Sequence, residues 1–389
     1  MASGKLVFAQ LMDFLPRYEF DACVRRYGGH RRPRGFSCRD QFLGLAFAQL
    51  TFRESLRDIE TCLRAVQPKL SHAGFRGQVS RSTLADAHRA HDWRIVADFA
   101  QVLIGRARTL YLDEPLGVEL EHTASAFDST TIDLGLSLFP WAHFRRRKGA
   151  VKLHTLWDLR GNIPGFVRVS HGKTSDVSAL DHLPIEPGSF SIMDRGSIDF
   201  QRLHRFTTGS AFFVTRAKRG LDFTRRARRR VDKTTGLRSD PTIVLVGPKT
   251  SRLYPDPLGR IAFYDAENDR RFVFLTNNFT LPALTIARIY KCRWQVELFF
   301  KWIKQHFRIK AFYGTSENAV KIQVWIAISV YVLVAIVKKE LGVERSLTEI
   351  LQILSLVLFE KTPIFQALSE ERTQNPDTEI PNQMMLFDL

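Results

Sequence analysis

One segment indicates both the fold and the chemistry of this chain: Tyr290-Lys291-Cys292-Arg293-Trp294-Gln295-Val296-Glu297-Leu298-Phe299-Phe300-Lys301-Trp302-Ile303-Lys304. Its apolar residues recur at the spacing of one buried helix face, namely Cys292, Val296, Phe299 and Ile303. One continuous helix would place four polar residues within an arc of about 60°: Tyr290, Arg293, Glu297 and Lys304. A phenol, a guanidinium, a carboxylate and an ammonium on one narrow face suit a phosphate chain beside a metal ion.

The same residues have a simpler interpretation. Arg293 with Glu297, and Glu297 with Lys301, are pairs four residues apart. Such pairs occur on ordinary surface helices and contribute a few tenths of a kcal/mol each. The choice between the two interpretations depends on acidic residues elsewhere in the chain.

The charge balance indicates the class of partner. The 389 residues include 57 Lys and Arg against 40 Asp and Glu, for a net charge of +17 at pH 7. Hydrophobic content of 44% is that of an ordinary globular protein with room for two or three domains. The excess of positive charge therefore predicts a polyanionic partner, most simply nucleic acid.

A membrane location is not expected. The most apolar run covers residues 322–337 and contains the polar residues Gln323 and Ser329. It is shorter than a membrane span, which needs about 20 residues. It predicts a buried core helix. The N-terminus lacks the apolar core of a signal peptide, and the four cysteines show no metal-ligand spacing. We expect a cytoplasmic protein, associated with the bacterial nucleoid, with reduced thiols.

Residues 1–115 are predicted to be helical. Residues 51–54 match a capping box, and Ser80 precedes a second helix. Basic loops between short helices are typical of a DNA-binding domain with helix-turn-helix character, although a plain helical scaffold has the same pattern. Helices are also expected at 341–368, and a disordered tail at 369–389.

Between these regions, residues 118–340 change to an α/β pattern. The expected order is three strands, a helix, a strand, a helix and a strand, followed by a β insertion at about 216–280. The insertion begins with a basic run, from Arg216 to Arg230, whose default interpretation is a solvated loop. Asp128 lies near the end of the first strand, Asp194 follows the fourth, and Glu297 lies on the helix after the insertion.

This order predicts a ribonuclease H-like mixed sheet, in which the first and fourth strands are neighbours. Asp128, Asp194 and Glu297 would then converge. Three carboxylates with open coordination positions are suited to Mg²⁺ or Mn²⁺. Two such ions can activate an attacking hydroxyl and stabilise a leaving oxygen during phosphoryl transfer.

The pattern Tyr290-x2-Arg293-x3-Glu297-x6-Lys304 resembles the signature of bacterial insertion-sequence transposases of the IS-four family. Asp128 in Phe-Asp-Ser-Thr and Asp194 in Met-Asp-Arg-Gly complete a set similar to the Asp-Asp-Glu triad of that family. The resemblance implies that the acids bind two metal ions, and that Tyr290, Arg293 and Lys304 bind phosphates near a cut transposon end. It also makes Phe272 the candidate to hold a flipped base, where the alternative is a strand residue packed in a core.

Further DNA contacts are expected from a basic cluster near the metal site: Arg145, Arg146, Arg147 and Lys148. Ser129 is an orienting group or a strand-end hydroxyl bonded to local backbone. His154 either points into the site or belongs to the edge of the core.

The leading hypothesis is a Mg²⁺-dependent transposase that binds terminal inverted repeats, cleaves the ends and joins them to target DNA as a homodimer. Two alternatives remain open: a ribonuclease H-like nuclease without strand transfer, and a DNA-binding repressor derived from a transposase. The C-terminal segment 383–387 resembles peptides that dock on the bacterial sliding clamp, with contacts expected from Gln383, Leu386 and Phe387.

Overall fold

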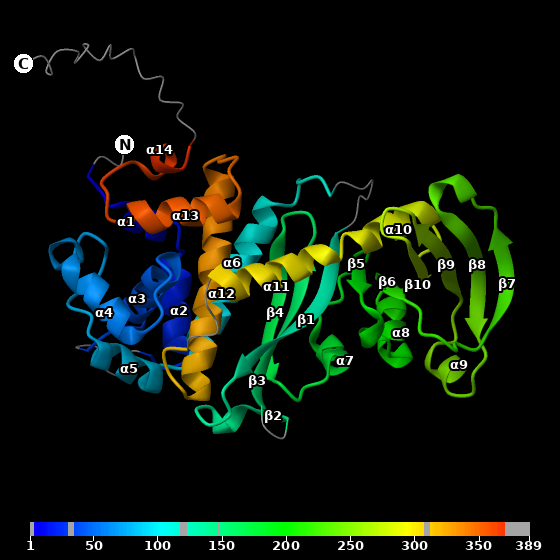
Figure 1. The fold of residues 1–389 in the computed structure, drawn as a ribbon, viewed down its shortest axis with the longest axis horizontal. Helices are drawn as coiled ribbons and strands as arrows, with labels where there is room; N and C mark the ends of the chain where they lie inside the picture. Colours follow the sequence, from blue (N-terminus) through cyan, green and yellow to red (C-terminus); the bar gives the residue numbers. More distant parts are fainter. Residues whose placement is uncertain (1–3, 30–34, 117–122, 146–147, 307–311, 370–389) are drawn as a thin grey trace, which may run out of the picture.

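A ten-stranded mixed sheet runs through half of the molecule (Figure 1). The computed structural model describes residues 4–29, 35–116, 123–145, 148–306 and 312–369. The strands of its first half are β1 Ala124–Leu134, β2 His143–Arg145, β3 Lys148–Asp158, β4 Ile163–His171, β5 Phe190–Met193 and β6 Phe212–Arg216. β1 pairs antiparallel with β3 and parallel with β5, and β5 pairs parallel with β6. β1 and β5, the first and fourth of the predicted strands, are therefore neighbours, as the ribonuclease H-like fold requires.

The insertion extends the same sheet. Its strands are β7 Phe223–Arg229, β8 Leu237–Leu245, β9 Leu258–Asp265 and β10 Arg270–Thr276. β10 pairs antiparallel with β6, and the order continues through β9 and β8 to β7 at the free edge. The three predicted insertion strands are confirmed. The expectation of a loop in the basic run was wrong for 223–229, because β8 offers this segment a pairing partner.

Alternating side chains divide the core between the two faces of the sheet. Phe127, Met193 and Phe213 face α7 Asp176–Ala179 and α8 Phe200–Thr208. Their neighbours Ala126 and Ile192 belong to the larger core on the opposite face, with α11 Trp294–His306. Because successive strand residues point to opposite faces, Asp128 and Asp194 point to the α11 side.

Helices from both ends of the chain pack together beside the sheet (Figure 1). The N-terminal helices are α1 Val7–Asp13, α2 Arg17–Arg26, α3 Cys38–Leu50, α4 Leu56–Ala65, α5 Arg81–Ala90 and α6 Trp93–Leu110. The C-terminal ones are α12 Glu317–Glu340, α13 Leu347–Val357 and α14 Ile364–Leu368. Ser80 caps α5 as predicted. The predicted capping box at 51–54 was wrong, because Thr51 ends α3 and Ser55 caps α4.

α12 contains the apolar run noted in the sequence. It is long and apolar enough to cross a membrane, but 94% of its most apolar window is buried inside the protein. Its residues between Val320 and Val337 are buried except Lys321. α12 is therefore a core helix between the N-terminal helices and the sheet, as predicted.

Candidate active site

Asp128 and Asp194 follow the last paired residues of two parallel strands. The β1–β5 ladder ends at Phe127 opposite Met193, and each aspartate is the next residue. The predicted position of Asp128 near the strand end was wrong: β1 continues to Leu134 because it stays paired with β3. Asp128 therefore lies where β5 ends, on a strand held rigidly on its other side.

The segment from Tyr290 to Lys304 is two helices and not one. α10 Ala283–Lys291 has Cys292 as its C-cap, and α11 begins at Trp294. The amides of Cys292 and Arg293 bond to carbonyls three residues earlier, which tightens the turn between them. The predicted single arc was wrong, but the turn directs the Arg293 side chain toward the sheet.

Arg293 bridges two of the three acids. One terminal nitrogen of its guanidinium donates to Asp128 Oδ2 at 2.8 Å, and the other donates to Glu297 Oε1. Burial lowers the pKa of Arg293, but the charges of Asp128 and Glu297 outweigh it and raise the pKa. Burial raises the pKa of Asp128, and Arg293 opposes that rise. The carboxylates of Asp128 and Glu297 thus share one positively charged partner, the Arg293 guanidinium.

Asp194 is contacted from α10 and from the insertion side of the sheet. The Tyr290 hydroxyl donates to Asp194 Oδ1 at 3.3 Å, and an Arg216 nitrogen lies 3.9 Å from the same oxygen. Burial raises the pKa of Tyr290 to about 12, so the phenol is protonated at neutral pH. Tyr290 is therefore a hydrogen-bond donor in the site and not a base.

A cavity of about 480 Å³ opens beside these residues, between the α10–α11 turn and the insertion. Phe272 lines it, half-buried, with the Arg216 guanidinium 5.3 Å from its ring centre. On its other sides the ring packs on Phe274 and Tyr290, at 5.7 and 6.3 Å between centres. Phe272 is thus packed in the core on one side and exposed to the cavity on the other. This position is compatible with a core strand residue and with a residue that holds a flipped base.

Trp294 lines the same cavity and was not singled out from the sequence. Its side chain is 54% exposed although it lines the cavity beside Arg293 and Glu297. It also borders a second, more apolar cavity of about 430 Å³ on the other side of α11, next to Leu298. Its position three residues before Glu297 on one helix would have placed it near that acid.

Ser129 and His154 lie on the opposite face of the sheet from the acids. Ser129 Oγ is 2.6 Å from His154 Nδ1, and the other ring nitrogen is 2.8 Å from Ser170 Oγ. His154 is fully buried, and burial lowers its pKa to about 4. The histidine is therefore a neutral core residue, and the sequence alternatives that placed Ser129 at the site or on local backbone were wrong.

The remaining candidates are less central. Lys304 is half-buried on α11, about 10 Å along the helix from Glu297. Arg145 and Lys148 are exposed at the β2–β3 turn, about 20 Å along β1 from Asp128, which is farther than expected. Five candidates lie outside the described residues, so they stay predictions: Arg146, Arg147, Gln383, Leu386 and Phe387.

The three acids offer the oxygen donors that a divalent cation prefers. Within the described ranges, no three acidic, histidine or cysteine side chains are close enough together to hold one metal ion. The Arg293 guanidinium stands between Asp128 and Glu297, where a cation would contact both. Thr155, directly opposite Asp128 on β3, has a buried hydroxyl without a hydrogen-bond partner. The donor set fits a divalent cation once Arg293 moves toward another anion.

The chain is similar in sequence to proteins named as transposases. Residues 119–333 match a family described as "Transposase DDE domain", and residues 3–76 match a domain of unknown function, DUF4372. The protein y4zB of Sinorhizobium fredii, named as a transposase, is 31% identical over 77% of this chain and 82% of its own length. A transposase-named protein of insertion element IS5377 from Geobacillus stearothermophilus is 30% identical over 58% of this chain and 57% of its own length. A third transposase-named protein, of element IS4SA from Synechocystis, is 25% identical over 73% of this chain and 79% of its own length.

Proposed function

Because the chain belongs to the DDE transposase family, we propose that it binds the terminal inverted repeats of an insertion sequence, cleaves the ends and joins them to target DNA. The observation that carries the proposal is the position of the three acids. Asp128 and Asp194 are neighbours at the end of the β1–β5 ladder, and Arg293 links Asp128 to Glu297. Glu297, Arg293 and Tyr290 line the cavity of about 480 Å³, where a phosphate chain would contact them.

Each residue has a distinct part in this proposal. Asp128, Asp194 and Glu297 would hold two Mg²⁺ or Mn²⁺ ions, which supply Lewis acidity at the attacking and leaving oxygens when bound. Arg293 would exchange its carboxylate contacts for a phosphate, a geometry that its planar fork matches. Tyr290 keeps its proton and donates to Asp194 or to a phosphate oxygen.

The decisive experiment uses linear DNA that carries the element's end and a labelled flank. With Mg²⁺ the parent protein should nick and then join the end to a second DNA, and both products should depend on Glu297. Cleavage without joining would favour the nuclease alternative. End binding with neither product would favour a DNA-binding repressor.

Two partners belong to the same proposal. Joining two ends to one target requires two active sites, so we expect a homodimer assembled on DNA. We also expect residues 383–387 to dock on the sliding clamp through Leu386 and Phe387. A peptide of residues 374–389 should bind purified clamp, and a Leu386→Ala, Phe387→Ala version should not. Equal affinity of the two peptides would remove the clamp from the proposal.

A further inference from the structure

The free edge of the sheet is formed by a strand of arginines. β7 reads Phe223-Thr224-Arg225-Arg226-Ala227-Arg228-Arg229, and every residue after Phe223 is exposed. A bulge at Arg226 interrupts the pairing of β7 with β8. Edge strands commonly carry charges that prevent pairing with other chains, but one or two charges suffice for that purpose. Four arginines in five positions call for a further reason.

These arginines differ from most of those described in residues 4–116, which lie in ion pairs. Among the described residues, no carboxylate lies within ion-pair distance of Arg225, Arg226, Arg228 or Arg229. Arg229 instead donates to the Phe279 carbonyl at 2.9 Å. Burial raises the pKa of Asp240, opposite Arg229 on the neighbouring strand β8, and the nearby charge of Arg229 opposes that rise. Arg225, Arg226 and Arg228 therefore present positive charge to solvent without an ion-pair partner among the described residues.

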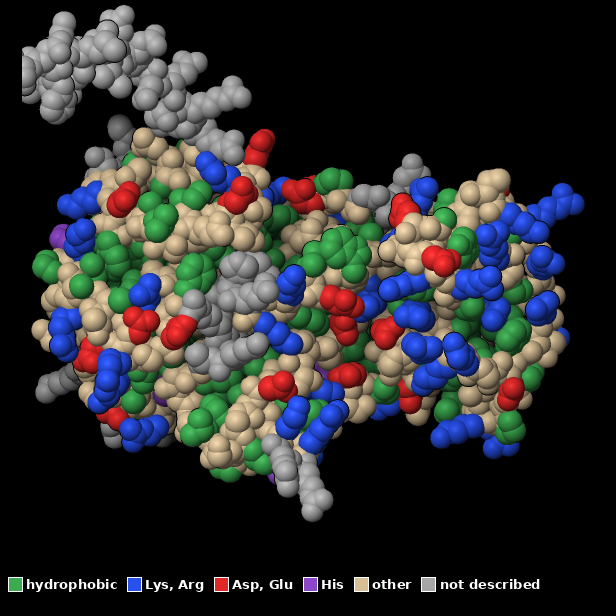
Figure 2. Space-filling model, in the orientation of Figure 1, with side chains coloured by type: hydrophobic (Ala, Val, Ile, Leu, Met, Phe, Trp, Pro, Cys, Tyr) green, Lys and Arg blue, Asp and Glu red, His purple; other side chains and the backbone are tan. Residues whose placement is uncertain are grey.

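The surrounding surface adds to this charge. Arg260 on β9 lies over the Phe223 ring at 5.1 Å, and its pKa is lowered by burial and by the nearby charge of Arg225. Figure 2 shows Lys and Arg side chains gathered over the insertion end of the molecule, whereas both signs of charge are interspersed over the helical end. Keeping like charges together costs free energy unless a polyanion neutralises them.

We propose that β7 is a binding site for the sugar-phosphate backbone of duplex DNA, separate from the catalytic cavity. From Arg225 to Arg229 the strand spans about 14 Å, a length over which duplex DNA carries about eight phosphate charges. Arginine forks bind phosphates in pairs of hydrogen bonds, and an edge strand holds them in a row. The contact reads no bases, so it adds affinity without sequence preference.

The sheet also sets the distance of this site from the cut, a step that rests on the proposed function. Five strand-to-strand steps separate β5, which ends at Asp194, from β7. At about 4.8 Å per step the separation is about 24 Å, which equals about seven base pairs of duplex. DNA cut at the acids would therefore reach β7 only if its arm on that side is about seven base pairs or longer.

The test compares two double variants with the same loss of charge. Arg226→Gln, Arg228→Gln removes two unpaired arginines, and Arg202→Gln, Arg205→Gln removes two that pair with Asp181 at 2.7 and 3.1 Å. Binding of a fluorescent 30-base-pair duplex of arbitrary sequence is measured by anisotropy over a series of KCl concentrations. The β7 variant should reduce the slope of log affinity against log salt by about 2, since each phosphate contact contributes about 0.9. The control should keep the parent slope.

A second arm tests the distance. End-bearing duplexes are shortened on the insertion side from 15 to 3 base pairs. The parent should lose affinity below about seven base pairs, and the β7 variant should bind all lengths alike. Equal slopes for the two double variants would overturn the proposal. An affinity deficit of the β7 variant relative to the parent that is the same for long and short arms would also overturn it. So would binding of phosphatidylserine vesicles through β7 with unchanged DNA binding. Because the first arm needs no cleavage, failure of the transposase proposal would be seen separately.

Discussion

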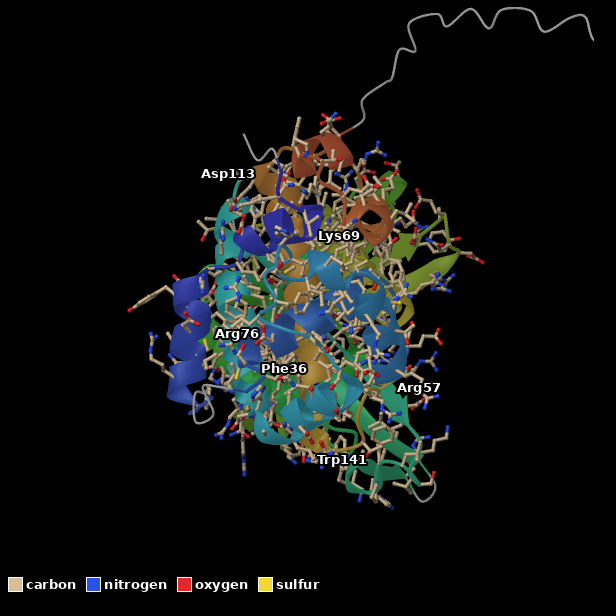
Figure 3. All side chains as sticks on the ribbon, turned by 90° about the vertical axis from the view of Figure 1, so that its left-hand side faces the viewer. Phe36, Arg57, Lys69, Arg76, Asp113 and Trp141 are labelled. Atoms are coloured by element: carbon tan, nitrogen blue, oxygen red, sulfur yellow. The ribbon has the colours of Figure 1, made fainter. Side chains whose placement is uncertain are left out.

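Most described arginines in residues 4–116 lie in ion pairs, whereas most of those in the insertion do not. At the helical end, which Figure 3 faces, Arg76 pairs with the buried Asp40 at 3.0 Å, and Arg106 pairs with Glu340 at 2.5 Å. At the insertion end the β7 arginines have no such partners among the described residues. The candidate active site lies between these extremes, since Arg293 is paired with two acids that belong to the site itself. Paired arginines hold structure, whereas unpaired ones are available to an external anion.

The comparison also bears on where the net charge acts. The value of +17 does not reveal whether positive residues are neutralised by neighbours. In the structure, part of the charge of the N-terminal helices is used in internal pairs, and the basic strand of the insertion is not. We therefore expect the salt dependence of DNA binding to come more from the insertion than from an equal number of arginines in residues 1–115.

The largest expected effect comes from the acids that Arg293 connects. Glu297→Ala or Asp128→Ala should reduce Mg²⁺-dependent cleavage by about 10³-fold or more, since the ligand set and its charge stabilisation are lost together. Binding of end DNA should be retained, because removing a negative charge does not weaken contact with phosphates. Measuring cleavage and binding on the same labelled end separates the two, and near-normal cleavage by Glu297→Ala would refute the assignment of this site.

The next effect tests whether Arg293 is a structural pair as well as a phosphate ligand. Arg293→Ala should lower the free energy of unfolding by about 1–3 kcal/mol at pH 7, because Asp128 is left buried without its partner. The pKa of Asp128, already raised by burial, should rise further. An acid whose pKa is higher in the folded than in the unfolded protein reduces stability as pH rises above its unfolded pKa. The destabilisation by Arg293→Ala should therefore be smaller near pH 4 than at pH 7.

Denaturant unfolding at the two pH values measures this difference. Arg293→Lys is the matched control, since it keeps a positive charge but loses the fork that reaches both acids. A destabilisation by Arg293→Ala that is equal at pH 4 and pH 7 would show that the loss is one of packing and not of charge pairing.

A core histidine gives a third test, on the face of the sheet away from the acids. The pKa of His154 is lowered by burial to about 4, whereas an unfolded histidine titrates near 6.5. As pH falls from about 6.5 to 4, the unfolded state gains a proton that the folded state does not, so stability falls by roughly 2–4 kcal/mol. A His154→Gln variant should lose that part of the pH dependence, measured by denaturant unfolding. Its cleavage at pH 8 should persist, because His154 does not face the site.

The sequence predicted that the first and fourth strands are neighbours because the strand order follows from local signals, and the assignment of the three acids stays a prediction. The strands before and after a turn at Asp158–Asn162 identify the fold even though the end of β1 was misplaced. The break between α10 and α11 was missed because Cys292 and Arg293 carry no glycine or proline signal; tertiary contacts of Arg293 favour the turn there. The β7 strand was missed for a similar reason, since its pairing with β8 outweighs a composition typical of loops.

The directions of several side chains relative to the sheet were also not predicted from the sequence. Ser129 follows Asp128 directly, so it points to the opposite face of the sheet, and strand alternation alone could have excluded it from the site. The distance of Lys148 from Asp128 needed the register between β1 and β3, which no local pattern provides. Trp294 was overlooked because an aromatic residue in a helix is more often part of a core than exposed beside an acid.

The smallest expected effect tests, at single residues, the difference between ion-paired arginines and the arginines of β7. Arg228→Gln should raise the free energy of unfolding by a few tenths of a kcal/mol at low ionic strength, because it relieves repulsion from Arg226 and Arg229. The gain should disappear at about 0.5 M KCl, where the screening length falls to a few ångströms. Arg205→Gln should have the opposite sign, since it removes a partner of Asp181. Thermal unfolding of both variants at low and high salt measures the signs directly. If Arg228→Gln destabilises the protein to the same extent as Arg205→Gln, the β7 arginines have internal partners and their charge is not reserved for DNA.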